Sequence, residues 1–348
     1  MLPSSNHPVT VTLPSEIAAL LRRGTVIPAH PLALDARRKL DARRQRALAR
    51  YYLDAGSGGL AVGVHATQFA IREAGLYEPV LKIAAEEAPH RKVILIAGLA
   101  GKTAAARMEA RIARALGYHC GMLSLGAMKG ASIDELVQHC ASVAAEIPLV
   151  GFYLQTAVGG IRLSMEFWRR FAAIENVVAI KIAPFNRYAT LDVVRGVVAA
   201  RAEDRIALYT GNDDHILLDL AVPFAIKRGN EEVRVRIAGG LLGHWSVWTK
   251  TAVDFLKTIQ QGKVDLALDS RITDCNSAFF DVANNFAGCI PGCHEVLRRQ
   301  GLLEGTWCLD PDEKLSPGQS EEIDRVYREH ADLADDAFVR ANLERWLS

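Results

Sequence analysis

The chain has 348 residues, half of them hydrophobic, and its 41 basic and 40 acidic side chains leave a formal net charge of +1. This length suffices for one large barrel or two domains, and the balanced charge gives no reason to expect nucleic acid or an anionic membrane as a partner. No apolar run approaches the roughly 20 residues that span a bilayer, and the N-terminus lacks the pattern of a signal peptide. We therefore expect a cytoplasmic protein.

The 6 cysteines lie at positions 120, 140, 275, 289, 293 and 308, too few and too scattered for a disulfide framework. Cys289, Cys293, His294 and Cys308 could be read as a metal cluster. Their spacing fits no standard zinc pattern, so buried free thiols are the favoured interpretation.

Strand and helix patterns alternate through residues 25–262. The predicted strands are 25–30, 60–65, 93–98, 121–125, 149–155, 177–183, 206–211 and 233–240. The predicted helices between and after them are 35–55, 72–88, 101–116, 132–146, 164–173, 190–201, 213–228 and 242–261. This alternation implies a parallel sheet with right-handed crossovers, and eight such units indicate a closed (β/α)8 barrel. A doubly wound open sheet is the alternative, but no GxGxxG follows the first strand.

The barrel pattern is flanked at both ends. Residues 1–24 are predicted to form a lead-in with a short amphipathic helix at 12–23. Residues 263–348 are predicted to form a C-terminal helical domain, broken at Pro291-Gly292 and again around 311–317. The predicted organisation is therefore 1–24, 25–262 and 263–348.

Lys181 lies in the apolar run 177–184, which is typical of a strand buried on both faces. A lone lysine there either reaches solvent or an ion-pair partner, or serves as a desolvated nucleophile that forms imines with carbonyl compounds. Strand alternation puts Lys181 on the same face as Ala179 and Ala183, where a cavity could open. Active sites of such barrels lie at the C-terminal strand ends. We therefore predict that Lys181 is catalytic.

The same rule selects two proton-transfer partners for this lysine. Tyr153 lies near the end of the neighbouring fifth strand, and a phenol can donate and recover a proton. His65 ends the second strand on the face of Ala61 and Gly63, and an imidazole works as an acid or base near neutral pH. We predict that both face inward and are catalytic.

The barrel, Lys181 in its Ile-Lys segment, Tyr153 before it and the Tyr-Thr-Gly-Asn-Asp run at 209–213 resemble one family. It is the dihydrodipicolinate synthase and N-acetylneuraminate lyase family of class I aldolases. The resemblance implies a Schiff-base lyase of the aldolase, dehydratase or synthase type that acts on pyruvate or another 2-oxo acid. It also implies that no cofactor is required and that the chain forms a homotetramer or homodimer.

Further residues at the strand ends are predicted to contact the substrate, and none is predicted to bind a metal. They are His30, Val64, Ala66, Thr67, Gln155, Gly211, Asn212 and Gly239.

The chain also departs from the family pattern. Residues 64–67 read Val-His-Ala-Thr where the family has Thr-Thr-Gly-Glu, and no arginine follows Tyr153 before Arg162. We therefore expect a divergent member with another 2-oxo acid substrate. Two alternatives remain: a non-catalytic barrel that binds a 2-oxo acid, and a metal-assisted hydrolase or isomerase that uses His30 and His65 with His244.

Overall fold

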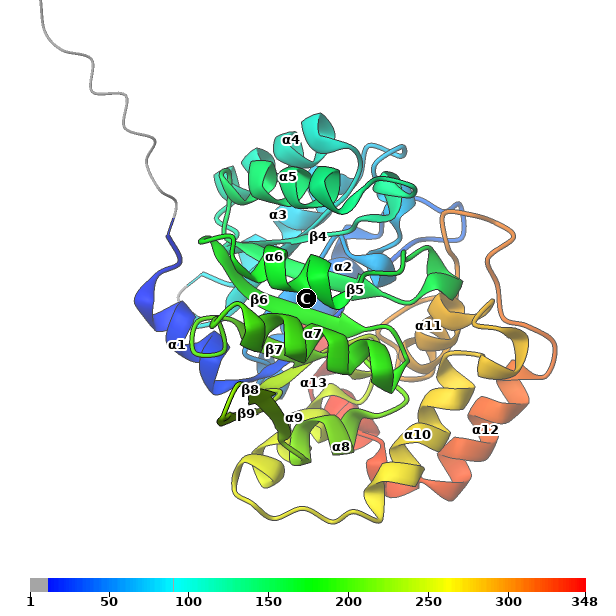
Figure 1. Ribbon diagram of the computed structural model, residues 1–348. Coiled ribbons are helices and arrows are strands. Elements are labelled where there is room, and N and C mark those ends of the chain that lie inside the picture. The colour runs from blue at the N-terminus through cyan, green and yellow to red at the C-terminus, as the bar shows by residue number, and fades with distance from the viewer. Residues whose placement is uncertain (1–11, 90) are drawn as a thin grey trace, which may run out of the picture.

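Residues 12–89 and 91–348 are described by the computed structural model in Figure 1. Eight parallel strands form one sheet in the order β1-β10-β7-β6-β5-β4-β3-β2. The sheet closes where the His30 amide donates to the Ala61 carbonyl at 2.8 Å, beside a parallel bridge between Ala29 and Ala61. The barrel strands are β1 (Val26–Pro28), β2 (Gly59–Val62), β3 (Ile94–Leu99), β4 (Cys120–Leu123), β5 (Leu149–Leu154), β6 (Val177–Ala183), β7 (Ala207–Thr210) and β10 (Gly239–Leu242). The predicted (β/α)8 barrel is confirmed.

Helices surround the strands as the outer layer of the barrel (Figure 1). They are α2 (Ala42–Ala55), α3 (Tyr77–Glu87), α4 (Thr103–Ala115), α5 (Ile133–Ala144), α6 (Met165–Ala172), α7 (Arg187–Ala199), α8 (Ile216–Ala221) and α9 (Thr249–Gln260). The N-terminal helix α1 (Ser15–Arg23) instead packs on the barrel interior through Ile17 and Leu21. The Tyr209 hydroxyl donates to the Leu21 carbonyl at 2.9 Å, so α1 is tied to an inward-facing strand residue.

Local side-chain chemistry sets where two helices begin. Ser132 caps α5 through a reciprocal capping box with Glu135. Helix α2 begins at Ala42, seven residues later than predicted. The Asp35 carboxylate accepts from the amides of Arg37 and Lys39 and so holds a turn in the predicted first turn of the helix.

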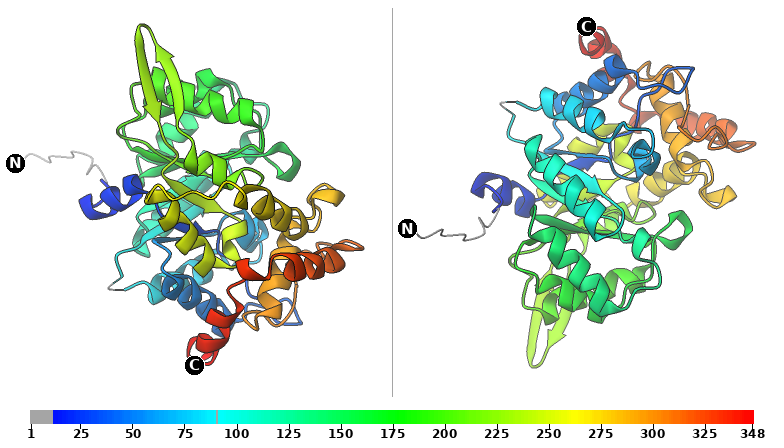
Figure 2. Two further views of the ribbon diagram at one scale, coloured as in Figure 1. Left: turned by 90° about the horizontal axis from the view of Figure 1, so that it is seen from below. Right: turned by 90° about the horizontal axis from the view of Figure 1, so that it is seen from above.

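The prediction for residues 213–240 is wrong. Helix α8 is short, and an antiparallel hairpin of β8 (Phe224–Arg228) and β9 (Glu231–Val235) follows it. The hairpin projects from the barrel wall in Figure 2. Buried Phe224 and Ile226 alternate with exposed Ala225 and Lys227, which is the period of a strand. The eighth barrel strand therefore begins only at Gly239.

Four helices follow the barrel: α10 (Leu268–Phe279), α11 (Cys289–Arg299), α12 (Gln319–Glu329) and α13 (Asp336–Leu347). The predicted break at Pro291-Gly292 is wrong, because these residues lie in the first turn of α11, where proline costs no helical hydrogen bond. Buried side chains of this segment share one apolar core with the barrel helices. Figure 1 shows α10, α11 and α12 together on one side of the barrel.

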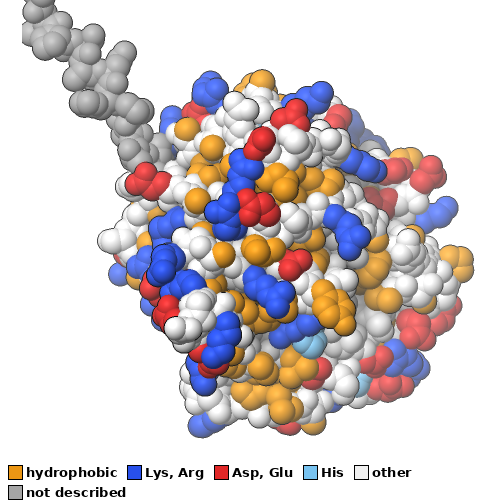
Figure 3. Space-filling view, viewed as in Figure 1, with side chains coloured by type: hydrophobic (Ala, Val, Ile, Leu, Met, Phe, Trp, Pro, Cys, Tyr) orange, Lys and Arg blue, Asp and Glu red, His pale blue; other side chains and the backbone are white. Residues whose placement is uncertain are grey.

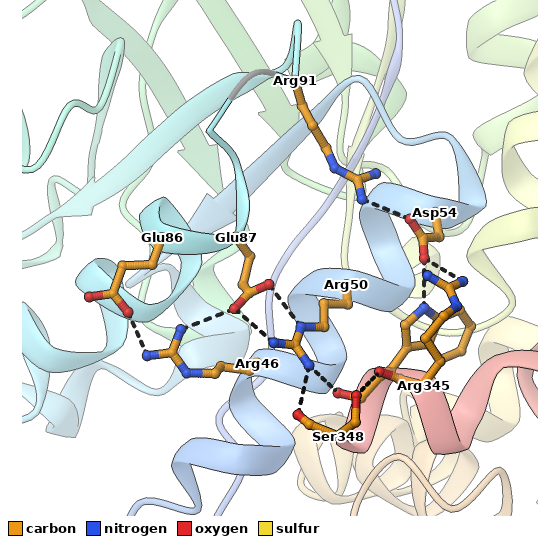
Figure 4. Close-up of polar contacts among 9 residues, drawn as sticks. Arg46, Arg50, Asp54, Glu86, Glu87, Arg91, Arg345 and Ser348 are labelled. Atoms are coloured by element: carbon orange, nitrogen blue, oxygen red, sulfur yellow. Dashed lines mark hydrogen bonds and ion pairs between the residues drawn. The ribbon is translucent and has the colours of Figure 1, made fainter.

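A polar network joins α13 to the barrel helices (Figure 4). Arg50 of α2 donates to the Trp346 carbonyl and to Glu87 of α3, while Asp54 accepts from the Trp346 indole at 2.7 Å. The face in Figure 3 shows basic and acidic side chains interspersed. Among the described residues, no helix combines the length and the apolar character that crossing a membrane requires.

Candidate active site

A cavity opens at the C-terminal ends of the strands and is covered by α11. The cavity has a volume of about 640 Å³, which includes the part that is open to solvent. Its polar side chains are Lys181 from β6, His65 after β2, Gln155 after β5, Asp213 after β7 and, from α11, Cys289, Cys293 and His294. This is the end of the barrel at which the strand-end rule places an active site.

Lys181 is buried at this mouth, with 7 % of its surface exposed. Its Nζ lies 4.7 Å from the centre of the Phe152 ring and forms no ion pair with any described residue. Burial lowers the pKa of the lysine, opposed by the negative charge of Asp213. The side chain has room because residue 211 is glycine: a Cβ there would stand 2.6 Å from the Lys181 Cε.

Asp213 is the carboxylate that faces this lysine across the cavity. It is buried, and one of its oxygens accepts from the His244 amide at 2.8 Å. Burial raises the pKa of the carboxyl, against the lowering effects of that hydrogen bond and of Lys181. Both side chains line the same cavity, and the negative charge of Asp213 acts on the lysine.

His65 lines the same cavity, as predicted. Gly63 has a φ of +76°, and this left-handed residue breaks the strand alternation so that both Val64 and His65 reach the cavity. Burial and then the Lys181 charge lower the pKa of His65 to about 4. The imidazole is therefore neutral at neutral pH, so one ring nitrogen can donate a hydrogen bond and the other can accept one.

The prediction that Tyr153 faces inward is wrong. Its ring packs on Trp168 of α6, with ring centres 5.3 Å apart, and its hydroxyl donates to the Leu163 carbonyl at 3.2 Å. The register explains why. Phe152, not Tyr153, pairs with Lys181, and paired residues of neighbouring strands face the same side. Phe152 therefore occupies the place expected for the tyrosine.

The histidines at 30 and 244 do not join His65. The His30 ring points to α2, with its Nδ1 3.0 Å from the Gln45 amide nitrogen and its ring edge against Tyr52. Ala29 before it faces the barrel, so alternation turns His30 outward. The His244 ring packs on Phe279. The three-histidine metal site is thus wrong, and so is the predicted substrate contact from His30.

Three other predicted contacts lie away from the cavity. The Thr67 hydroxyl donates to the His30 carbonyl at 2.6 Å and accepts from the Gly63 amide, so it fixes the loop after β2. The Asn212 side chain bridges the loops after β6 and β7, because it accepts from the Phe185 amide at 3.1 Å. Gly239 begins β10 at the opposite end of the barrel. By contrast, Val64, Ala66, Gln155 and Gly211 line the cavity.

Several cavity residues were missed from the sequence. They are Phe152, Phe185, Asp213, Phe280, Cys289, Cys293 and His294. Asp213 belongs to the 209–213 run and ends a strand unit, so its position was a usable signal. The residues of α11 and Phe280 carry no such signal, because the strand-end rule does not reach a segment that folds back over the mouth.

The barrel, its C-terminal helices and the buried lysine at the strand ends define a class of aldolase-like barrels. The profile of the dihydrodipicolinate synthetase family matches residues 23–324, and the chain belongs to this family. It is 25% identical over 300 residues to the N-acetylneuraminate lyase of Citrobacter koseri, which covers 84% of this chain and 93% of that protein.

Solved structures share the fold at lower identity. Dihydrodipicolinate synthase of Aquifex aeolicus matches with a TM-score of 0.73 and 18% identity, over 88% of this chain and 98% of that one. The chloride-inhibited dihydrodipicolinate synthase of Acinetobacter baumannii, solved in complex with pyruvate, gives the same values, with a TM-score of 0.73 and 18% identity over 88% and 98% of the two chains. Membership of the family implies an enzyme of the pyruvate-dependent class I lyase type. The divergence predicted from the sequence agrees with these low identities.

Proposed function

We propose that this protein is a Schiff-base lyase that acts on pyruvate or another 2-oxo acid through Lys181. The observation that supports it best is the lysine itself: a buried amine at the C-terminal end of a barrel strand, with no ion-pair partner among the described residues. A lysine held this way has a lowered pKa and a larger fraction of neutral, nucleophilic amine. The family of the chain supports the same reaction class.

In this proposal the neutral amine attacks the ketone carbon, and the carbinolamine loses water to give an imine. A proton then leaves the neighbouring carbon, and the resulting enamine carbon forms a bond to an aldehyde carbon. The aldehyde oxygen takes up a proton, and water hydrolyses the imine to release product and lysine. The reverse sequence cleaves the same bond.

Asp213 and His65 are proposed to move these protons, because the Tyr153 hydroxyl is bonded away from the cavity. Asp213 has one oxygen fixed by the His244 amide and a raised pKa, which suits a carboxyl that both gives and takes a proton. His65 is neutral and faces the same space. For either residue to act in this way, the substrate carbonyl must lie between its side chain and Lys181.

The substrate carboxylate is proposed to bind at the turn after β2. The amides of His65 and Ala66 begin the 3-10 turn His65–Thr67 and donate no hydrogen bond within the described part of the chain. The side chains of Val64 and Ala66 line the cavity beside them. Backbone N–H groups at such a turn are ready donors to an anion.

Borohydride reduction tests the proposal. We expect the protein incubated with pyruvate or a matched 2-oxo acid and sodium borohydride to gain one reduced adduct by intact mass. The Lys181→Arg variant keeps a cation of similar length but cannot form the imine, so it should gain none. If a panel of 2-oxo acids leaves the native protein unlabelled, the proposal fails.

A barrel that binds a 2-oxo acid without turnover is the second candidate, favoured by Phe152 in the place expected for the tyrosine. It predicts an adduct on reduction but no exchange of the pyruvate methyl protons with deuterated water. A lyase would show both the adduct and the exchange.

We also propose, from the family of the chain, that the protein forms a homotetramer or a homodimer. Light scattering measures the mass of the assembly and checks this.

A further inference from the structure

The outer wall of the cavity is apolar and includes two aromatic rings. Phe185 follows β6 and Phe280 follows α10, and their rings lie parallel with centres 6.5 Å apart. Ile290 of α11, Leu154 at the end of β5 and Val158 in the loop after it complete this wall. Because these residues come from three separate parts of the chain, the apolar surface is a property of the assembled fold.

Phe185 of this wall adopts an unfavourable backbone conformation. Its φ is +50°, in the left-handed region that residues other than glycine rarely adopt. The Asn212 side chain holds this conformation by accepting from the Phe185 amide. Asn212 is in turn fixed by donating to Thr190 at 3.1 Å and to Asp219 at 2.9 Å. A strained residue held by a buried network at a site is a sign of function.

The charges of the cavity exclude some ligands. Among its lining residues in the described ranges, Lys181 is the sole lysine and there is no arginine. Once Lys181 carries the imine, no lysine or arginine side chain of this lining is left to pair with a second carboxylate. A chain of hydroxyls would need several hydrogen-bond partners, and the apolar side chains of this wall offer none. Besides Lys181, Asp213 and His65, the polar side chains of the cavity are Gln155 and, on α11, Cys289, Cys293 and His294.

We propose that the part of the substrate beyond the reacting carbons is apolar and flat, such as the aryl group of an aromatic aldehyde. This inference rests on the proposed imine chemistry at Lys181. For benzaldehyde, the enamine of pyruvate forms a bond to the aldehyde carbon, and the aldehyde oxygen takes a proton. Hydrolysis by one water then releases 4-hydroxy-2-oxo-4-phenylbutanoate and the free amine.

The test compares imine trapping by two 2-oxo acids that differ at the distal end. With the full chain and borohydride, 2-oxo-4-phenylbutanoate should label at least about tenfold faster at subsaturating concentration than 2-oxoglutarate, because only its ring is desolvated favourably by the wall. Equal rates, or faster labelling by 2-oxoglutarate, would overturn the inference. Labelling by pyruvate is measured separately. If pyruvate labels the protein but 2-oxo-4-phenylbutanoate is not preferred over 2-oxoglutarate, the proposed function stands and only the aromatic subsite is refuted.

A pair of variants at one position sharpens the result. The Phe280→Leu variant keeps an apolar wall and should keep the preference for the aryl acid. The Phe280→Lys variant places a cation there and should lower the ratio of aryl to dicarboxylate labelling at least about tenfold. An unchanged ratio in a folded Phe280→Lys protein contradicts the inference. If that variant does not fold, the comparison on the native protein decides alone.

Discussion

At the scale of single residues, the hydroxyl of Tyr153 is hydrogen-bonded to the Leu163 carbonyl and not to the cavity. A hydroxyl bonded to backbone outside the barrel cannot relay a proton to an imine inside it. Tyr153→Phe should therefore leave borohydride labelling and turnover intact while lowering the free energy of unfolding by about 1 kcal/mol, the cost of one lost hydrogen bond. Urea unfolding and pyruvate labelling measure the two effects. A large loss of turnover in a stable variant would return Tyr153 to the mechanism.

Asp213→Asn separates charge from shape at the carboxylate that faces the lysine. The asparagine oxygen can still accept from the His244 amide, so the loop should hold. The negative charge of Asp213 raises the pKa of Lys181, and its removal lowers that pKa further. Since imine formation needs the neutral amine, its rate rises with pH through the lysine pKa. This rise should move to lower pH in the variant, while turnover falls because an acid–base group is lost.

The pH profile of labelling checks the sign of this shift. A rise that moves to higher pH in Asp213→Asn, or that does not move, would show that the carboxylate does not act on Lys181. Turnover that survives the substitution would assign the proton transfer to His65 instead.

Gly211→Ala tests whether the lysine needs the space beside it. The added Cβ would stand 2.6 Å from the Lys181 Cε and 2.8 Å from the Ala183 Cβ, so either the amine or the strand must shift. A displacement of this kind should slow labelling at least about tenfold. Circular dichroism should report a folded barrel, because the strain is local. Unchanged labelling would mean that the amine works from another rotamer.

At the scale of elements, strand existence was readable from sequence, but strand pairing was not. The predicted strand at residues 177–183 has the same bounds in the structure, because a long apolar run rich in β-branched residues is typical of a buried strand. The inward face of β5 was misassigned, because alternation along one strand separates two sets of side chains but does not say which set faces inward. The pairing of Phe152 with Lys181 decides it, and that pairing depends on two strands at once. The β8–β9 hairpin was not predicted, although apolar and polar residues alternate visibly in its sequence. The repeating strand–helix pattern favoured a helix there.

Helix α13 offers a prediction at the same scale. Trp346 is fully buried between α13 and α2, and its indole donates to Asp54. Trp346→Ala should lower the free energy of unfolding by about 3–5 kcal/mol, while Trp346→Phe, which loses the hydrogen bond but keeps most of the packing, should cost less. Urea unfolding of the two variants shows which of them loses more free energy of unfolding. An equal loss would show that the hydrogen bond, not packing, holds this helix.

At the scale of the whole molecule, the candidate site is assembled from two regions. The barrel supplies Lys181, Asp213 and His65, and these were within reach of strand-end reasoning because the fold class fixes where strands end. The segment after residue 262 supplies Phe280 and Ile290, and its path across the mouth depends on long-range packing that composition and periodicity do not encode. The proposed reaction class therefore rests on the barrel, and the proposed substrate class on the barrel together with the segment that covers its mouth.

The site of the reduced adduct tests the Schiff-base proposal most directly. After incubation with pyruvate and borohydride, the native protein is digested and its peptides are mapped by mass spectrometry. We expect one modified lysine, Lys181, and no adduct in the same peptide of Lys181→Arg. An adduct on another lysine at comparable yield, or labelling that persists in Lys181→Arg, would contradict it.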